Sequence, residues 1–526
     1  MARTSLFDRI SRALRKAHLL ESLGPRAEEA LERTHGVGLT RRALLSGAGA
    51  VAAGAAVAGC APDAAADEAS ATINGLRGSA RVVIVGAGLG GITAAYRLAR
   101  RGLSPVVYEA GERVGGRSFS LRGAFATKCE LGGEFIDTGH REIRGLAREL
   151  GLTLLDVKRA TAGLEAERYF VDGARYTEAQ VIELFRPVAR ILARDLAALG
   201  NDNVAYDDST PVGRAFDRIS IAEWFDREGV RGPIRTLLDT AYVGEYGRET
   251  DQQTYLNLLW LISPRPDPFQ VFGDSDERFI VSEGTDAVST RMAARLPSPV
   301  RFGQALSAVR ERADGKVVLT FEQGRRSAEV EADFVVLALP FTQLRKVDLR
   351  VEMPAVKRRA IRELPYGTNA KLMVGMSRRV WREQGSSGTG YHDAVFNECW
   401  DSSSGFDTAG AVLTAFSGGR FGVEAGGGSA EHQAARFLGV AERLWPGVSG
   451  AYTGRAVRMH WPTAPLFEGS YSCYAPGDYS AISGAEALVT GRIHYAGEHT
   501  NPDFQGFLEG AVGSGSRAAE EILARV

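Results

Sequence analysis

Glycines and one glutamate near residue 90 have the spacing of a dinucleotide-binding site. Gly86, Gly88 and Gly91 form the pattern G-x-G-x-x-G, and Glu109 follows about 20 residues later. In this motif the first glycine permits a tight turn, the second lets backbone approach a pyrophosphate, and the third lets a helix pack on a strand. The carboxylate accepts hydrogen bonds from an adenosine ribose. These residues therefore predict binding of an adenine dinucleotide.

The segments around the motif supply the elements that must position it. Residues 81–85 are a short β-branched run typical of a buried parallel strand, residues 92–102 have a helical pattern, and residues 105–108 predict a second strand. A helix that begins at the glycine turn directs its positive end at a bound phosphate. Because strand, turn, helix, strand and acid occur in order, we expect a ligand there rather than a glycine-rich turn without one.

A second block of arginines and glycines indicates which dinucleotide is bound. Arg113-Val114-Gly115-Gly116-Arg117 follows Glu109, and a further pair, Gly132-Gly133, lies between Glu130 and Phe135. Two arginines and two glycine pairs suit a second wrapping of backbone around a long dinucleotide. With the blocks 334–347 and 461–523, this segment resembles the flavin-containing amine oxidase family, which includes monoamine oxidases, polyamine oxidases and L-amino-acid oxidases. The resemblance extends from about residue 80 to the C-terminus and implies FAD as the cofactor.

The resemblance also implies where FAD is held. The last contacts would come from residues 494–498 and 506–511, and the backbone near Val309 would face the adenine. We find no second glycine motif for NADPH, so oxygen or another acceptor must reoxidise the flavin. The cofactor-binding residues that we predict are Gly86, Gly88, Leu89, Gly90, Gly91, Glu109, Ala110, Arg113, Gly116, Arg117, Gly132, Gly133, Glu134, Val309, Gly497, Glu498, Phe507 and Leu508.

Catalytic residues follow from the same resemblance. Tyr471 and Phe507 match two aromatic side chains that many family members place in front of the flavin, and Trp461 matches a tryptophan that packs against it. Such a cage favours the neutral form of an amine. Lys346 matches a lysine that, in relatives, holds a water at flavin N5. Ser470 stands where monoamine oxidases carry the cysteine that bonds the flavin, so we expect non-covalent FAD.

The implied reaction is oxidation of a primary or secondary amine to an imine, with oxygen reduced to hydrogen peroxide. Phe135 and Asp137 are candidate substrate contacts, because polyamine oxidases carry an acid at the position of Asp137. Such an acid could hold the distal ammonium of a diamine. The alternative is that Glu134 and Asp137 are solvated or pair with Arg141 or Arg144.

Other activities remain open at this point. An L-amino-acid oxidase needs an arginine for the substrate carboxylate, and the family motif has it just after the second glycine pair, where this chain has Glu134 to Asp137. A FAD-dependent desaturase or oxidase of a non-amine substrate would share the FAD blocks. A flavin-binding protein without catalysis is a third alternative.

The predicted fold class is α/β, with two domains, because 526 residues exceed what one hydrophobic core holds. Residues 80–140, 275–345 and 461–526 would form a Rossmann-type FAD domain, a parallel sheet with helices. Residues 141–274 and 346–460 would form a sheet-and-helix substrate domain. Within residues 141–274, apolar residues at helical spacing in 177–199 predict a helix, and Ser220 and Glu223 predict a capping box.

The first 79 residues have a different character. Arg41-Arg42 precedes an uncharged Ala/Gly/Val run and resembles a twin-arginine export signal, and Cys60 ends a sequence that resembles a lipobox. We therefore expect residues 1–60 to be an export leader and 61–79 a linker. The protein would cross the cytoplasmic membrane through the twin-arginine machinery and reside in the periplasm or cell envelope, with Cys60 as a candidate lipid anchor. The alternative is a disordered Ala/Gly tail.

Composition excludes several other classes. The formal net charge is -1, so no basic excess indicates nucleic acid. The four cysteines form no C-x-x-C pair and there is no His/Cys cluster, so we expect neither a metal site nor a disulfide framework.

Overall fold

The computed structural model describes residues 80–526, and the predicted export leader and linker lie outside them. Residues 81–519 form one compact unit. Among the described residues, no helix has both the length and the apolar character needed to cross a membrane.

A four-stranded parallel sheet brings together segments that are far apart in the sequence. Its order is β19 (Ile493–Tyr495), β12 (Phe334–Leu337), β1 (Val82–Val85) and β2 (Val106–Tyr108). Every residue of β1 and β12 is buried, as expected for central parallel strands of β-branched and apolar residues. The predicted assembly of one sheet from three separated regions is therefore observed.

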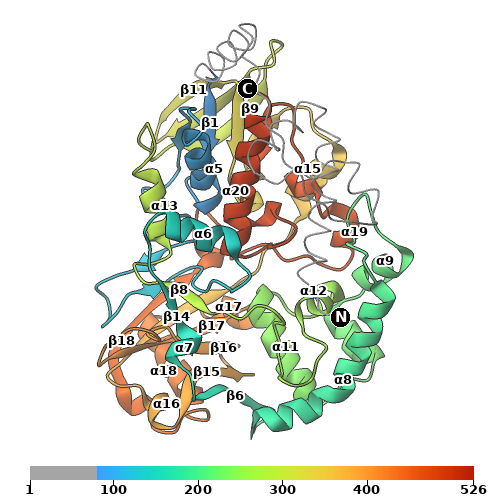
Figure 1. Ribbon diagram of the computed structural model, residues 1–526, viewed down its shortest axis with the longest axis vertical. Helices are drawn as coiled ribbons and strands as arrows, with labels where there is room; N and C mark the ends of the chain where they lie inside the picture. Colours follow the sequence, from blue (N-terminus) through green and yellow to red (C-terminus); the bar gives the residue numbers. More distant parts are fainter. Residues whose placement is uncertain (1–79) are drawn as a thin grey trace, which may run out of the picture. The chain divides into compact units, whose positions relative to one another are not determined.

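Two helices pack closely beside this sheet. Helix α5 (Leu89–Ala99) follows β1, and α20 (Leu508–Leu523) is the last helix of the chain; they lie side by side in Figure 1. A Cβ atom at Gly515 would lie only 2.3 Å from the carbonyl oxygen of Gly90. This close approach places the N-terminal ends of both helices near the end of β1.

A second four-stranded sheet covers the other side of the parallel sheet. It consists of β11 (Arg326–Ala332), β10 (Val317–Gln323), β9 (Ala305–Glu311) and β13 (Asp348–Arg350). The two sheets share one apolar cluster, in which the rings of Tyr108 and Phe321 stack with centroids 4.2 Å apart.

The two regions predicted to form the substrate domain contribute to one seven-stranded sheet. Strand β6 of the first region pairs in parallel with β15 of the second, with Tyr169 opposite Tyr391. The order of the sheet is β18 (Tyr452–His460), β14 (Ala370–Met376), β17 (Ala411–Ser417), β16 (Glu398–Asp401), β15 (Ser386–His392), β6 (Glu165–Val171) and β7 (Ala174–Tyr176). The α/β class with a second, sheet-rich part is thus confirmed, whereas the domain boundaries stay a prediction.

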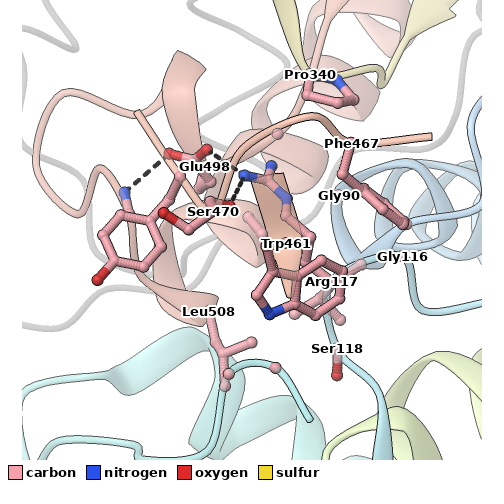
Figure 2. A pocket seen from close by; sticks show the side chains of 18 of the residues that line it. Gly90, Gly116, Arg117, Ser118, Pro340, Trp461, Phe467, Ser470, Glu498 and Leu508 are labelled. Carbon is pink, nitrogen blue, oxygen red and sulfur yellow. Dashed lines mark hydrogen bonds and ion pairs between the residues drawn. The ribbon is translucent and has the colours of Figure 1, made fainter. Parts of the chain in front are cut away.

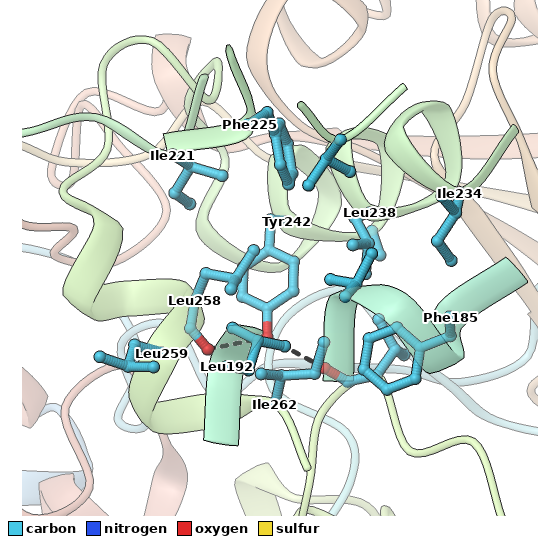
Figure 3. Packing of buried hydrophobic residues seen from close by; sticks show 14 of the residues in the cluster. Phe185, Leu192, Ile221, Phe225, Ile234, Leu238, Tyr242, Leu258, Leu259 and Ile262 are labelled. Atoms are coloured by element: carbon cyan, nitrogen blue, oxygen red, sulfur yellow. Dashed lines mark hydrogen bonds between the residues drawn. The ribbon is translucent and has the colours of Figure 1, made fainter. Parts of the chain in front are cut away.

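Helices pack against this sheet around a large apolar core. In Figure 3 the rings of Phe185 and Tyr242 point toward Leu192, Leu238 and Leu258. The predicted capping box at Ser220 is confirmed, because its side chain and that of the glutamate three residues on bond each other's backbone N–H groups. The helices are α8 (Glu178–Leu199), α9 (Pro211–Asp217), α10 (Ile221–Arg227), α11 (Pro233–Tyr246) and α12 (Tyr255–Leu261).

Further helices and strands complete the fold. They are β3 (Ser120–Leu121), β4 (Cys129–Glu130), α6 (Arg141–Glu149), β5 (Leu154–Asp156), α7 (Val157–Ala160), β8 (Phe279–Val281), α13 (Asp286–Ala293), α14 (Phe341–Leu344), α15 (Ala355–Glu363), α16 (Val380–Glu383), α17 (Gly419–Glu424), α18 (Ala430–Ala441) and α19 (Asp478–Ile482).

Candidate functional site

A cavity of about 470 Å³ runs from the parallel sheet to the seven-stranded sheet. It begins where β1 and β12 end, at Gly86 and Ala338, and includes Trp400 and Phe416 at its other end. The chain leaves β1 toward β2 on one side, while β12 lies on the other side. Ligands of open α/β sheets bind at such a point, outside the carboxyl ends of the strands.

The glycine turn has the geometry that a phosphate needs. Gly86 has a φ of +97°, and a Cβ at Gly91 would lie 2.0 Å from the carbonyl oxygen of Gly86. A Cβ at Gly88 would meet no atom within 4 Å, so the turn faces open space there. Helix α5 begins at the next residue without a side-chain cap, which leaves N–H groups of its first turn available to an anion.

Glu109 ties this turn to the end of β2. Its carboxylate accepts hydrogen bonds from the N–H groups of Ala87 and Gly111, each at 2.7 Å, and it lines the cavity. A carboxylate has about four acceptor positions, so it can also accept from a ribose hydroxyl.

The two predicted arginines have different roles. Arg117 lines the cavity, and its Nη1 donates to the carbonyl oxygen of Ser470 at 2.6 Å and to Glu498 at 2.9 Å (Figure 2). It thereby joins the N-terminal and C-terminal parts of the wall. Arg113 is not part of the wall: it donates to the Gly116 carbonyl oxygen at 2.6 Å and holds the shape of the loop.

The remaining predicted cofactor residues line the cavity, apart from Gly91 and Val309. Gly91 faces the turn itself, as its packing role requires. The side chain of Val309 is fully buried in the apolar cluster between the two sheets, so the contact of its backbone with the adenine stays a prediction. The beginning of the same strand reaches the cavity instead, through Gln304, Ala305 and Leu306.

Buried polar atoms without a hydrogen-bond partner indicate that this wall binds a ligand. The Ser118 hydroxyl and the Gln343 side-chain amide nitrogen are buried in the wall and have no hydrogen-bond partner within residues 80–526. Buried polar groups are normally satisfied. The open glycine turn, the acid at the end of β2 and these free groups together fit an adenine dinucleotide.

The structure brings the three predicted aromatic residues to the same cavity. The Tyr471 hydroxyl donates to the Glu245 carbonyl oxygen, and a Cβ at Gly506, next to Phe507, would lie 3.5 Å from the Tyr471 ring. The Trp461 indole N–H donates to the Leu131 carbonyl oxygen at 3.1 Å. Their catalytic roles stay a prediction.

Ser470 also lines the cavity, at the position where we expect no covalent link to the flavin. Its hydroxyl is 2.5 Å from the Asn369 side-chain oxygen and donates to it. This side chain therefore has a protein partner of its own.

The buried lysine of the cavity is Lys371. Lys346, for which the sequence predicts a water-holding role at the flavin, is half exposed, and that role stays a prediction. The Lys346 side chain lies at the edge of the cavity, is 51% exposed and forms an ion pair with Glu468 at 2.6 Å. The Lys371 side chain is 6% exposed and donates to the Gly132 carbonyl oxygen and to Glu134, both at 2.8 Å. A lysine within the apolar run of β14 was the sequence signal for it, since buried lysines need a partner or a function.

The predicted substrate acids are buried and have partners other than Arg141 and Arg144. Asp137 accepts from the Ser275 hydroxyl and the Glu277 N–H, each at 2.8 Å, and lies 3.3 Å from His140. Glu134 pairs with Lys371, as described above. Both carboxylates are buried and line the cavity, and a contact of Asp137 with the substrate stays a prediction.

Three further carboxylates line the cavity, and sequence analysis missed them. Burial, together with the charge of nearby carboxylates, raises the pKa of Glu245 to about 7 and that of Glu277 to about 8. Burial also raises the pKa of Glu398 well above its usual range. They come from α11, from the loop before β8 and from β16, so no local pattern could have grouped them.

Comparisons with known proteins agree on one group of enzymes. The family model for flavin containing amine oxidoreductase matches residues 89–523. An L-amino acid dehydrogenase of Synechocystis sp. is 24% identical over 470 residues, covering 84% of this chain and 94% of that protein. A flavin-containing amine oxidase of Oncorhynchus mykiss is 24% identical over 458 residues, covering 84% and 85%.

Solved structures show the same fold. A putrescine oxidase bound to putrescine superposes with a TM-score of 0.72 at 22% identity, covering 85% of this chain and 99% of that one. Cyclohexylamine oxidase from Brevibacterium oxydans superposes with a TM-score of 0.73 at 21% identity, with the same coverage.

Proposed function

Since the chain belongs to the flavin-containing amine oxidoreductase family and is therefore an oxidoreductase with FAD as its cofactor, we propose that it oxidises a primary or secondary amine to an imine and passes the electrons to oxygen. The observation that carries this proposal is one cavity that includes both the dinucleotide turn at Gly86–Gly90 and the aromatic residues Tyr471 and Phe507. Relatives named for a diamine and for a monoamine support an amine substrate.

The protein's own part is to bind FAD and the amine, to orient them and to exclude water from the site. FAD, when bound, accepts the hydride equivalent that leaves the amine's α-carbon. Gly88 and Glu109 would hold its pyrophosphate and ribose, and Arg117 would keep the surrounding loops in place. Tyr471 and Phe507 would exclude water and favour the neutral amine over the ammonium.

We assign the water-holding role to Lys371 rather than Lys346. An ammonium has three donors, and the Nζ of Lys371 makes two short bonds and one longer contact, 3.4 Å to the Glu130 carbonyl oxygen. A water that enters the cavity would replace the longer contact to the Glu130 carbonyl oxygen. Lys346 is half exposed, so its ammonium is bound by Glu468 and bulk solvent rather than by a water within the cavity.

An L-amino-acid dehydrogenase is the second candidate, because one of the relatives carries that name. Its substrate carboxylate needs a free cation. Arg117 is the arginine of the described wall, and it already pairs with Glu498, while Lys371 pairs with Glu134. The unpaired charges of the wall are carboxylates, which favour a cationic amine.

The holoenzyme tests this proposal directly. We expect amines to bleach the flavin absorbance under anaerobic conditions, and oxygen to restore it with release of hydrogen peroxide. Bleaching by L-amino acids alone would favour the second candidate. A flavin that no amine reduces would contradict the proposed amine oxidation. Colour that returns only with an artificial acceptor would contradict oxygen as the electron acceptor.

We further propose that FAD is bound without a covalent link, because the side chain at position 470 is a serine whose hydroxyl bonds Asn369. Acid denaturation should then leave a colourless pellet and free FAD.

Export remains a proposal from residues 1–79. We propose that Arg41-Arg42 directs twin-arginine export and that Cys60 anchors the protein by lipidation. Replacing both arginines by lysine should leave the enzyme in the cytoplasm, and Cys60→Ala should release it from the membrane fraction. Unchanged fractionation of either variant contradicts the corresponding part.

A further inference from the structure

A second cavity adjoins the first. It measures about 240 Å³, and its wall includes Lys158, Ala162 and Gly163, which are exposed. The two cavities have a common wall, to which Glu134, Phe135, Glu277, Glu398 and Trp400 belong. The second cavity, here called the outer cavity, therefore lies between the cofactor cavity and a surface of the molecule.

The charges of the common wall do not balance. Glu134 has Lys371 as its partner, at 2.8 Å. Within residues 80–526, Glu277 and Glu398 have no ion-pair partner, and the same holds for Glu245 farther along the cofactor cavity. Glu398 is 7% exposed, and its carboxylate accepts a hydrogen bond from Tyr391.

An independent observation at the same wall is an unused donor. The indole N–H of Trp400 is buried, the residue is 7% exposed, and no acceptor for it exists in the described part of the chain. Its ring also lies 4.9 Å from the Lys371 Nζ, so its face already meets one cation. The common wall thus combines two carboxylates without an ion-pair partner and one buried N–H donor without an acceptor.

We propose that the substrate is a diamine or polyamine whose distal ammonium is held by Glu277 and Glu398 at the common wall while the reacting amine lies beyond it, toward Tyr471 and Phe507. This inference rests on the proposed amine oxidation.

The electrostatics of the wall favour a dication over a monoamine. Leaving charged carboxylates buried without a partner is costly, and each of these groups responds with a raised pKa. A bound ammonium supplies the missing positive charge through charge-assisted hydrogen bonds. A monoamine that reacts as the neutral form leaves the wall uncompensated, so it gains nothing there.

The test compares short α,ω-diamines with n-alkylamines of the same carbon number, using the holoenzyme. We expect the diamine to have a kcat/KM about tenfold to a hundredfold higher. The diamine should also raise the anaerobic Tm more than the monoamine does. The Tm measurement reports binding without turnover, so it decides on the dication even where an amine is not oxidised.

Matched variants identify the carboxylates. Glu277→Gln and Glu398→Gln, alone and combined, keep the shape of the side chain and remove charge, and the combination should reduce the diamine preference to within about twofold. Glu167→Gln is the control, because Glu167 is a half-buried acid of β6 whose pKa is also raised but which lines neither cavity. It should keep the wild-type preference.

The measurements distinguish a failure of the dication inference from a failure of the proposed amine oxidation. A wild-type enzyme that oxidises and binds the monoamine as well as the diamine overturns the dication inference and leaves amine oxidation intact. A diamine preference that survives in the double variant overturns the assignment to Glu277 and Glu398. A flavin that no amine reduces contradicts amine oxidation, and the Tm comparison then still accepts or rejects dication binding.

Discussion

Lys371→Met should lower kcat/KM by about a hundredfold or more, whereas Lys346→Met should change it far less. The reason is position: the Lys371 side chain is 6% exposed and bonded to the Gly132 carbonyl oxygen and to Glu134, while that of Lys346 is 51% exposed and pairs with Glu468. Stopped-flow measurement of flavin reduction and of reoxidation by oxygen separates the two half-reactions.

The variant needs a control for stability. Removing Lys371 alone leaves Glu134 buried without its partner, which costs about 3–5 kcal/mol of unfolding free energy unless the acid is protonated. Lys371→Met combined with Glu134→Gln removes both charges and should restore most of the Tm while activity stays low. Reoxidation and turnover at the wild-type rate in either variant would remove Lys371 from the mechanism.

Glu109→Arg should yield a protein almost free of FAD. The substitution removes the acceptor of two backbone N–H bonds, each 2.7 Å long, and brings a cation against those same donors at the dinucleotide turn. Loss of the hydrogen bond that a ribose hydroxyl would donate to this carboxylate costs about 1.5–3 kcal/mol, so FAD affinity should fall about tenfold to a hundredfold, and the disturbed turn should lower it further. The ratio of flavin to protein absorbance after purification measures the effect.

Glu112→Arg provides the matched control, because it makes the same change of charge three positions away at an exposed residue. This variant should retain its colour. A normal FAD content in Glu109→Arg would mean that the acid at the end of β2 does not contribute to the cofactor site.

The parts of the site that sequence predicted well are those built from short segments. The glycine turn, α5 and Glu109 lie within one strand-helix-strand unit, so spacing alone determines how they meet. The capping box at Ser220 is equally local. For such features the residue types and their order carry nearly all of the geometry.

Features that depend on long-range packing were not predictable in this way. Lys346 and Lys371 are both lysines near predicted strands, and only the pairing of β14 within the seven-stranded sheet buries the second. Val309 lies four residues beyond Ala305 on one strand, and the packing of two sheets determines which of them reaches the cavity. Similarly, Glu245, Glu277 and Glu398 meet only in the folded chain.

The bonds from Arg117 to Ser470 and Glu498 span 353 and 381 positions of the chain, and β12 acquires its second neighbour only when β19 pairs with it. Contacts of such high sequence separation form late, because loop closure must precede them. A growing chain still attached to the ribosome can form the glycine turn but cannot complete its wall until the last fifty or so residues have emerged. We therefore expect stable FAD binding only after translation has ended.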